Sequence, residues 1–176
     1  MADDVVNRDR LQPALLDRLT DHSPHDRNIE APEMRTLTRA KLRQLVLRDL
    51  TWLLNAPRCF TEDEQARYPS LRSSTLNYGI VPLAGKLASR VELHELENLI
   101  RQAIVDFEPR ILPDQLVVKG IVSETLLETH NVVSFQISGR LWAQPYPIEL
   151  LLKTDVDLES GAARVVEAST TARIDG

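Results

Sequence analysis

The histidines of this sequence are the first residues to consider for chemistry, because they can bind metals or transfer protons. His22 and His25 have a spacing at which both could contact one metal ion, but a metal site needs further ligands and none follows nearby. We therefore interpret this pair as part of a solvated loop. His94 and His130 offer no better pattern. The motifs that bind phosphates, dinucleotides or catalytic zinc are absent, so no cofactor is expected.

Cysteine and carboxylate side chains are the other candidates for chemistry. Cys59 has no nearby residue that could act as its base, so we interpret it as a partly buried structural thiol rather than a nucleophile. Asp155, Asp157 and Glu159 are spaced like carboxylate metal ligands, but they stand at the end of an expected strand. A solvated strand edge is therefore the preferred interpretation. Because Cys59 is the only cysteine, no disulfide can form within the chain, and a reducing compartment is favoured.

Composition limits the class of protein further. The chain has 176 residues, of which 43% are hydrophobic, enough for one domain with its own core. A net charge of −5 argues against nucleic acid as a partner, because nucleic-acid-binding proteins present basic surfaces. The first residues are acidic where a signal peptide would be basic, and no run approaches the roughly 20 apolar residues of a membrane span. We expect a soluble cytosolic protein with no membrane insertion.

Helical periodicity dominates the first part of the sequence. Residues 1–30 read as a flexible segment with a short amphipathic helix whose leucines include Leu15, Leu16 and Leu19. Residues 31–172 are expected to form a single domain. A helix is predicted over residues 38–54, and a second is predicted to start at the capping box Ser89–Glu92 and to end near Phe107. The connection over residues 55–88 is rich in proline and glycine, so little regular structure is expected in it.

A two-residue periodicity of apolar and polar residues begins at about residue 116. Alternating apolar and polar residues predict strands over residues 133–143 and 148–156, with a bend at residues 144–147 between them. Shorter strands are predicted over residues 116–123 and 164–168. The sequence therefore predicts an α+β fold in which N-terminal helices precede an antiparallel meander of three or four strands that packs on them.

Three segments carry recognisable motifs. Residues 71–80 read LRSSTLNYGI and contain Asn77-Tyr78-Gly79, residues 107–111 read FEPRI, and residues 15–19 read LLDRL. These segments resemble the S-x-L-N-Y-G-L, F-E-P-R-L and N-terminal L-L-D-R-L segments of one known family, the TssE subunits of the type VI secretion baseplate. The resemblance runs from about residue 11 to residue 168, with isoleucine in place of leucine at positions 80 and 111.

The resemblance implies a role in assembly. It suggests a structural subunit in the wedge of a contractile, phage-tail-like baseplate, docked at the inner face of the cytoplasmic membrane. The partners that it implies are the wedge subunits TssF, TssG and TssK and the sheath subunits TssB and TssC. It also introduces an alternative, because members of this family have carried the label lysozyme-like.

The lysozyme alternative can be tested against the residues. A glycosidase needs two carboxylates facing each other across a cleft, one of them protonated to act as the acid. Glu108 is the obvious candidate, but the neighbouring Arg110 favours its charged form, the wrong one for an acid. Only 5% of the chain is aromatic, which is low for a sugar-binding surface, and a cell-wall enzyme would also need export. The sequence therefore favours a non-enzyme.

Glu108, Pro109 and Arg110 suggest a docking site instead. Proline fixes the backbone between the two charges, so an exposed Arg110 could bind a partner carboxylate with two hydrogen bonds. The alternative is a structural corner in which Arg110 pairs within the chain. Together with the resemblance, this reasoning predicts a partner-binding set of nine residues: Leu15, Leu16, Leu19, Asn77, Tyr78, Gly79, Glu108, Pro109 and Arg110.

Two further docking modes follow from the expected elements. An open meander leaves an edge strand whose backbone groups a sheath-subunit arm could pair with. The short N-terminal helix could lay its leucines into a groove of a partner, or it could pack on its own domain.

Overall fold

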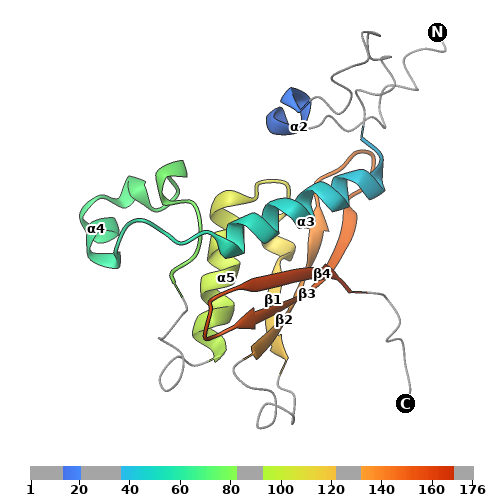
Figure 1. Cartoon of the computed structure of the whole chain (residues 1–176). Helices are drawn as coiled ribbons and strands as arrows, with labels where there is room; N and C mark the ends of the chain where they lie inside the picture. Colours follow the sequence, from blue (N-terminus) through green and yellow to red (C-terminus); the bar gives the residue numbers. More distant parts are fainter. Residues whose placement is uncertain (1–13, 21–36, 83–92, 122–131, 169–176) are drawn as a thin grey trace, which may run out of the picture.

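Two long helices and a four-stranded sheet form the framework of the computed structural model, which describes residues 14–20, 37–82, 93–121 and 132–168. Figure 1 shows helices preceding the sheet along the chain. The α-helices are α2 (Leu15–Leu19), α3 (Arg39–Asn55), α4 (Glu62–Arg67) and α5 (Leu93–Phe107). The strands are β1 (Val117–Ile121), β2 (Val132–Leu141), β3 (Ile148–Asp157) and β4 (Ala163–Glu167). Three 3₁₀ turns, η2 (Pro69–Leu71), η3 (Thr75–Asn77) and η4 (Pro113–Gln115), complete the described elements. The predicted α+β class is confirmed.

Helices α3 and α5 form where the periodicity of the sequence predicts them. The backbone N–H of Lys41 donates to the side chain of Thr38, which caps α3. Their apolar stripes are buried, with Val46 and Leu50 on α3 and Ile100 and Ile104 on α5 almost inaccessible. The capping box predicted at residues 89–92 lies outside the described residues. Helix α5 ends at Phe107, as the proline two residues later predicts.

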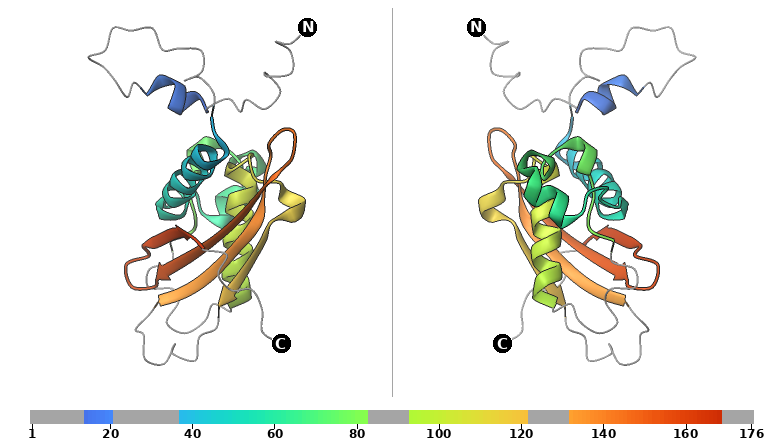
Figure 2. Two further views of the ribbon diagram at one scale, coloured as in Figure 1. Left: turned by 90° about the vertical axis from the view of Figure 1, so that its right-hand side faces the viewer. Right: turned by 90° about the vertical axis from the view of Figure 1, so that its left-hand side faces the viewer.

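The sheet is a meander in the order β1-β2-β3-β4, with every neighbouring pair antiparallel. In one row across the sheet, Val118 lies opposite Ile137, and Ile137 lies opposite Leu152 on β3. All three are buried, because the side chains of this row point towards the helices. Helix α3 packs near β4 and α5 near β1, so both cover the same face of the twisted sheet, as Figure 2 shows. The core lies between the two layers.

The long connection after α3 contains more regular structure than the sequence predicts. Helix α4 starts with a capping box in which the N–H of Glu64 donates to the Thr61 hydroxyl oxygen, while the Glu64 carboxylate accepts from the N–H of Thr61. The 3₁₀ turns η2 and η3 follow. The expectation of little regular structure here is therefore wrong, and the signal that it overlooked is the T-x-x-E pattern of residues 61–64.

None of the helices in the described ranges is long and apolar enough to cross a membrane.

Candidate functional site

The corner formed by Glu108, Pro109 and Arg110 connects α5 to the sheet. The Leu112 N–H donates to the Arg140 carbonyl oxygen at 2.9 Å, and the Trp142 N–H donates to the Arg110 carbonyl oxygen at 2.7 Å. The corner is therefore bonded to the end of β2 on both sides of Ile111. Because Ile111 is buried in the core, the chain has little freedom to move at this point.

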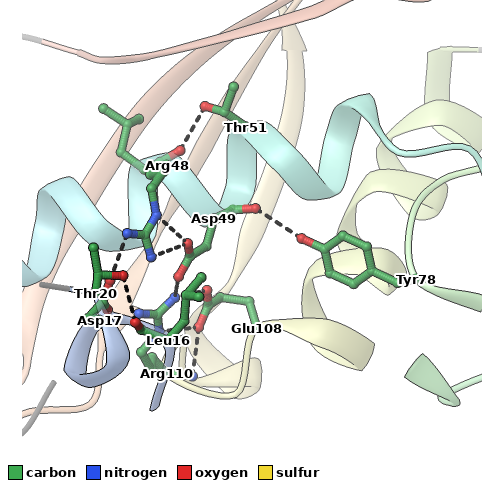
Figure 3. Close-up of polar contacts among 10 residues, drawn as sticks. Leu16, Asp17, Thr20, Arg48, Asp49, Thr51, Tyr78, Glu108 and Arg110 are labelled. Atoms are coloured by element: carbon green, nitrogen blue, oxygen red, sulfur yellow. Dashed lines mark hydrogen bonds and ion pairs between the residues drawn. The ribbon is translucent and has the colours of Figure 1, made fainter. Parts of the chain in front are cut away.

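The two charged side chains of the corner bind each other. The Arg110 Nε donates to Glu108 Oε1 at 2.7 Å, and its Nη2 contacts Glu108 Oε2, which gives a two-pronged pair. The same Nη2 also reaches Asp49 Oδ2 on α3. Figure 3 shows Arg110 between the two carboxylates. Only 4% of the Glu108 side chain and 24% of the Arg110 side chain are exposed.

The pKa of Arg110 reflects this arrangement. Burial alone would lower the pKa of a guanidinium, but the hydrogen bonds and negative charges of Glu108 and Asp49 outweigh it and raise the pKa above its ordinary value. Arg110 therefore carries its charge at every physiological pH. The expectation that Arg110 is an exposed corner residue is wrong. The internal pairing that the sequence left open as an alternative is the one observed, because a carboxylate buried as deeply as Glu108 needs a cation beside it.

Tyr78, from the second motif, is anchored to the same turn of α3. Its hydroxyl group donates to the Asp49 carbonyl oxygen at 3.3 Å, and its ring packs edge-on against Phe107 with centroids 5.4 Å apart. Burial, followed by the negative charges of Asp49 and Glu108, raises the pKa of the Tyr78 hydroxyl. Two segments that are about 30 residues apart in sequence therefore meet at Asp49.

Asn77 and Gly79 are held by the backbone around the end of α3. Asn77 is fully buried, and its Oδ1 accepts from the Phe60 N–H at 3.3 Å. Gly79 has φ +126°, and a β-carbon there would overlap the carbonyl oxygen of Ala56. This motif requires glycine because both the dihedral angle and the close approach exclude a side chain.

Asp49, Arg48 and Asp17 are the members of this network that are not among the predicted partner-binding residues. Arg48 donates through Nε to Asp49 and through Nη1 to Asp17 on α2, at 2.8 and 2.7 Å. The sequence did contain a signal for Asp49. It stands three residues after Val46 and four before Leu53, so it occupies a position of the buried stripe of α3 where an apolar residue is expected. A carboxylate at such a position needs a cation supplied by another element. The network joins Asp17, Arg48, Asp49, Arg110 and Glu108.

Helix α2 exposes its leucines. Leu15 is 69% exposed, Leu16 52% and Leu19 74%, so none of them contributes to the core. An ion pair between Asp17 and Arg48 ties α2 to α3, and the Arg48 guanidinium also lies 4.7 Å from the centre of the Trp52 ring. Helix α2 therefore attaches through a polar residue and leaves its apolar side chains accessible.

The other candidates for chemistry have structural roles. Cys59 is exposed, so its interpretation as a partly buried thiol is wrong; it lies in the segment that connects α3 to α4. Asp157 caps its turn by accepting from the N–H groups of Glu159 and Ser160, and Asp155 pairs with Ser134 and Lys153. Within the described ranges, no group of three or more histidine, cysteine or acidic side chains could hold a metal ion.

The corner does not have the geometry of a glycosidase. Glu108 is buried and bound on both oxygens by Arg110, so neither oxygen faces a place for a sugar. The nearest second carboxylate, Asp49, is bound by Arg48 and Arg110. The charges neutralise one another and leave no acid and base on opposite sides of a cleft. What the arrangement can do is hold two helices and a strand end in a fixed relative position.

The fold is an α+β domain in which a charged corner ties α5 to α3 and to the end of β2. Residues 40–146 match the family described as baseplate wedge protein gp25, which is more than half of the chain. The chain belongs to this family of baseplate structural proteins, and the resemblance based on its motifs is confirmed at the family level. No curated protein and no solved structure matches the chain.

We expect Arg110→Ala to destabilise the protein strongly. The substitution leaves Glu108 buried without its cation, and breaking such a pair typically costs about 3 to 5 kcal/mol. Urea unfolding of the purified variant would measure the loss. Arg67→Ala is the matched control, because Arg67 is exposed on α4, and we expect it to change stability by less than about 0.5 kcal/mol. An Arg110→Ala variant as stable as the control would show that the corner does not depend on this pairing.

Proposed function

We propose that this protein is a wedge subunit of a type VI secretion baseplate, in the cytoplasm at the inner face of the cytoplasmic membrane. There it docks other wedge subunits, TssF, TssG and TssK, and the first ring of sheath subunits, TssB and TssC. The observation that carries this proposal is membership of the baseplate wedge family. The type VI assignment rests on the three TssE-like motifs, residues 15–19, 71–80 and 107–111.

The proposed role is structural and not catalytic. Glu108, the candidate acid, is committed to Arg110 and is inaccessible. We expect purified wild-type protein to release no soluble fragments from peptidoglycan, and Glu108→Gln to match it. Fragment release by the wild type that disappears in Glu108→Gln would instead support the lysozyme-like alternative.

The proposed wedge contact is formed by α2 and the outer side of the corner. Leu15, Leu16 and Leu19 are apolar, accessible and held in place through Asp17, which suits insertion into a groove of a partner. Pro109 is exposed beside the buried pair of Glu108 and Arg110. In this proposal Glu108, Arg110, Asn77, Tyr78 and Gly79 contribute to docking by fixing the shape of the surface.

The proposed sheath contact is the free edge of β4. In the antiparallel pairing with β3, the Ala168 N–H donates to Leu151 and the Asp157 N–H to Ala162. By the alternation of such ladders, the backbone groups of Ala163, Val165 and Glu167 point away from β3. The Asn55 side chain occupies those of Ala163. No described residue is bonded to the outward backbone groups of Val165 and Glu167, so these groups can pair with an added strand.

The opposite edge of the sheet is covered by α5. The Glu97 carboxylate accepts from the Gly120 N–H at 2.7 Å, and the Arg101 Nε donates to the Leu116 carbonyl oxygen at 3.3 Å. The bond from Gly120 is the main cause that lowers the pKa of Glu97. Because these side chains occupy backbone groups at the edge of β1, strand addition is favoured at β4.

Substitutions on α2 and on β4 test the two proposed contacts separately. We expect the double variant Leu15→Ser and Leu19→Ser to lower co-purification with TssF and TssG at least about tenfold. The substitutions remove the apolar burial of two leucines in the complex, which lowers the binding free energy by more than about 1.4 kcal/mol. Sheath recruitment by preassembled wedges should be spared in Glu167→Ala and lost in Glu167→Pro, because proline removes an N–H that faces the added strand and not β3. None of these three variants should change the melting temperature appreciably.

Leu76→Ser is the control for the leucines, since Leu76 is equally exposed on η3, outside the proposed contact. If the α2 variant keeps its wedge partners, the apolar contact is wrong. If Glu167→Pro recruits sheath as well as Glu167→Ala does, strand addition at β4 is wrong.

A further inference from the structure

A cleft of about 910 Å³ lies between α5 and the segment 58–77, which we call the α4 arm. The arm leaves the end of α3 and projects beyond the sheet (Figure 1). Helix α4 has no buried residues, so the arm does not fill the space beside α5 with its own side chains. The cleft is lined by Arg58, Glu62, Gln65, Ala66, Pro69, Arg72, Glu95, Asn98, Leu99 and Gln102.

Arg58 is the buried cation of this cleft, and it is incompletely paired. Its side chain is 9% exposed, and its Nε donates to the Gly79 carbonyl oxygen at 2.9 Å. Its Nη2 lies 3.8 Å from Asp106 Oδ2, which is an ion pair but too long for a hydrogen bond. Arg110, in contrast, has hydrogen bonds to two carboxylates. Arg58, unlike Arg110, has no hydrogen bond from either of its terminal Nη groups to a described residue.

Asp106 does not complete the pairing. Its Oδ1 accepts from Gln102 at 2.7 Å, while its Oδ2 is buried without a hydrogen bond. That oxygen lies 4.0 Å from the Nε of Arg72 as well, so one carboxylate stands between two guanidinium groups. Burial is the main cause that lowers the pKa of Arg58, and the positive charge of Arg72 adds to it against the opposing charge of Asp106. This end of the cleft has an uncompensated positive charge.

The rest of the lining limits what can enter. Leu99, Ala66 and Pro69 provide apolar surface, while Glu62 and Glu95 are exposed at the rim. Two acidic residues at the rim disfavour a polyanion such as nucleic acid. They tolerate a segment that carries one carboxylate among apolar and neutral residues. The cleft therefore fits a peptide segment better than a phosphate-rich ligand.

We infer that this cleft binds a carboxylate-bearing segment of a partner protein, whose aspartate or glutamate faces Arg58 and Arg72 from within the cleft, where Asp106 is not part of the lining. The planar guanidinium of Arg58 can donate two hydrogen bonds to such a group. Apolar side chains next to it in the partner pack on Leu99 and Ala66. This inference goes beyond the wedge proposal and does not depend on it, since it follows from the buried, incompletely paired Arg58 and the apolar part of the lining.

The test is photo-crosslinking of the full-length protein in its native host. A photoreactive amino acid replaces Asn98, which is exposed on the cleft, and in a control it replaces Gln136, which is exposed on the outer face of the sheet. We expect position 98 to crosslink a segment containing aspartate or glutamate. Arg72→Glu should lower the yield at least about tenfold, because it replaces an attractive charge facing the partner's carboxylate by a repulsive one.

A charge swap decides whether the carboxylate is the cause. When the acidic residue of the crosslinked segment is replaced by arginine, the crosslinking yield with the Arg72→Glu variant should recover. The same replacement should lower the yield with the wild-type protein. Arg67→Glu, on the same arm but not lining the cleft, should have no effect, and melting curves should show both variants folded. A crosslinked segment without acidic residues, a yield no higher than at position 136, or a yield insensitive to Arg72→Glu would each overturn the inference. The identity of the crosslinked protein bears separately on the wedge proposal.

Discussion

The bond between Arg110 and the two carboxylates of Glu108 and Asp49 is the interaction on which the rest of this structure depends. It closes the corner after α5 and fastens that corner to the middle of α3. Tyr78 reaches the backbone of the same aspartate, and Arg48 connects it to α2. Segments that are separated in sequence thereby become neighbours around one turn of one helix. A buried carboxylate is costly unless paired, which makes this arrangement intolerant of partial replacement.

The charged side chains of the corner pair with one another, so the proposed partner contacts use other surfaces of the domain. The exposed leucines of α2, the outward backbone groups of β4 and the incompletely paired Arg58 are three such surfaces. They lie on different elements, and all of these elements meet α3 or continue from it. A rigid centre with separate peripheral contacts is consistent with a structural subunit of a multi-protein baseplate.

Much of the fold follows from the sequence, because periodicity reports which side of an element is buried. The stripe through Leu96, Ile100 and Ile104 and the alternation through Phe135 and Ile137 predicted α5 and β2 correctly. The α4 arm was missed because proline and glycine outweighed a four-residue capping signal. The burial and internal pairing of Arg110 could not be predicted, because its second partner, Asp49, is 61 residues away in sequence and only the fold brings the two together. Partner binding by the nine predicted residues stays a prediction.

A double-mutant cycle between Asp49 and Arg110 tests the central claim most directly. The unfolding free energies of wild type, Asp49→Ala, Arg110→Ala and the double variant would be measured in urea. If the corner is fastened to α3 through this contact, the two losses are not additive, and the coupling free energy is at least about 1 kcal/mol. Losses that add to within about 0.3 kcal/mol would contradict the account, because they would mean that the two residues stabilise the protein independently.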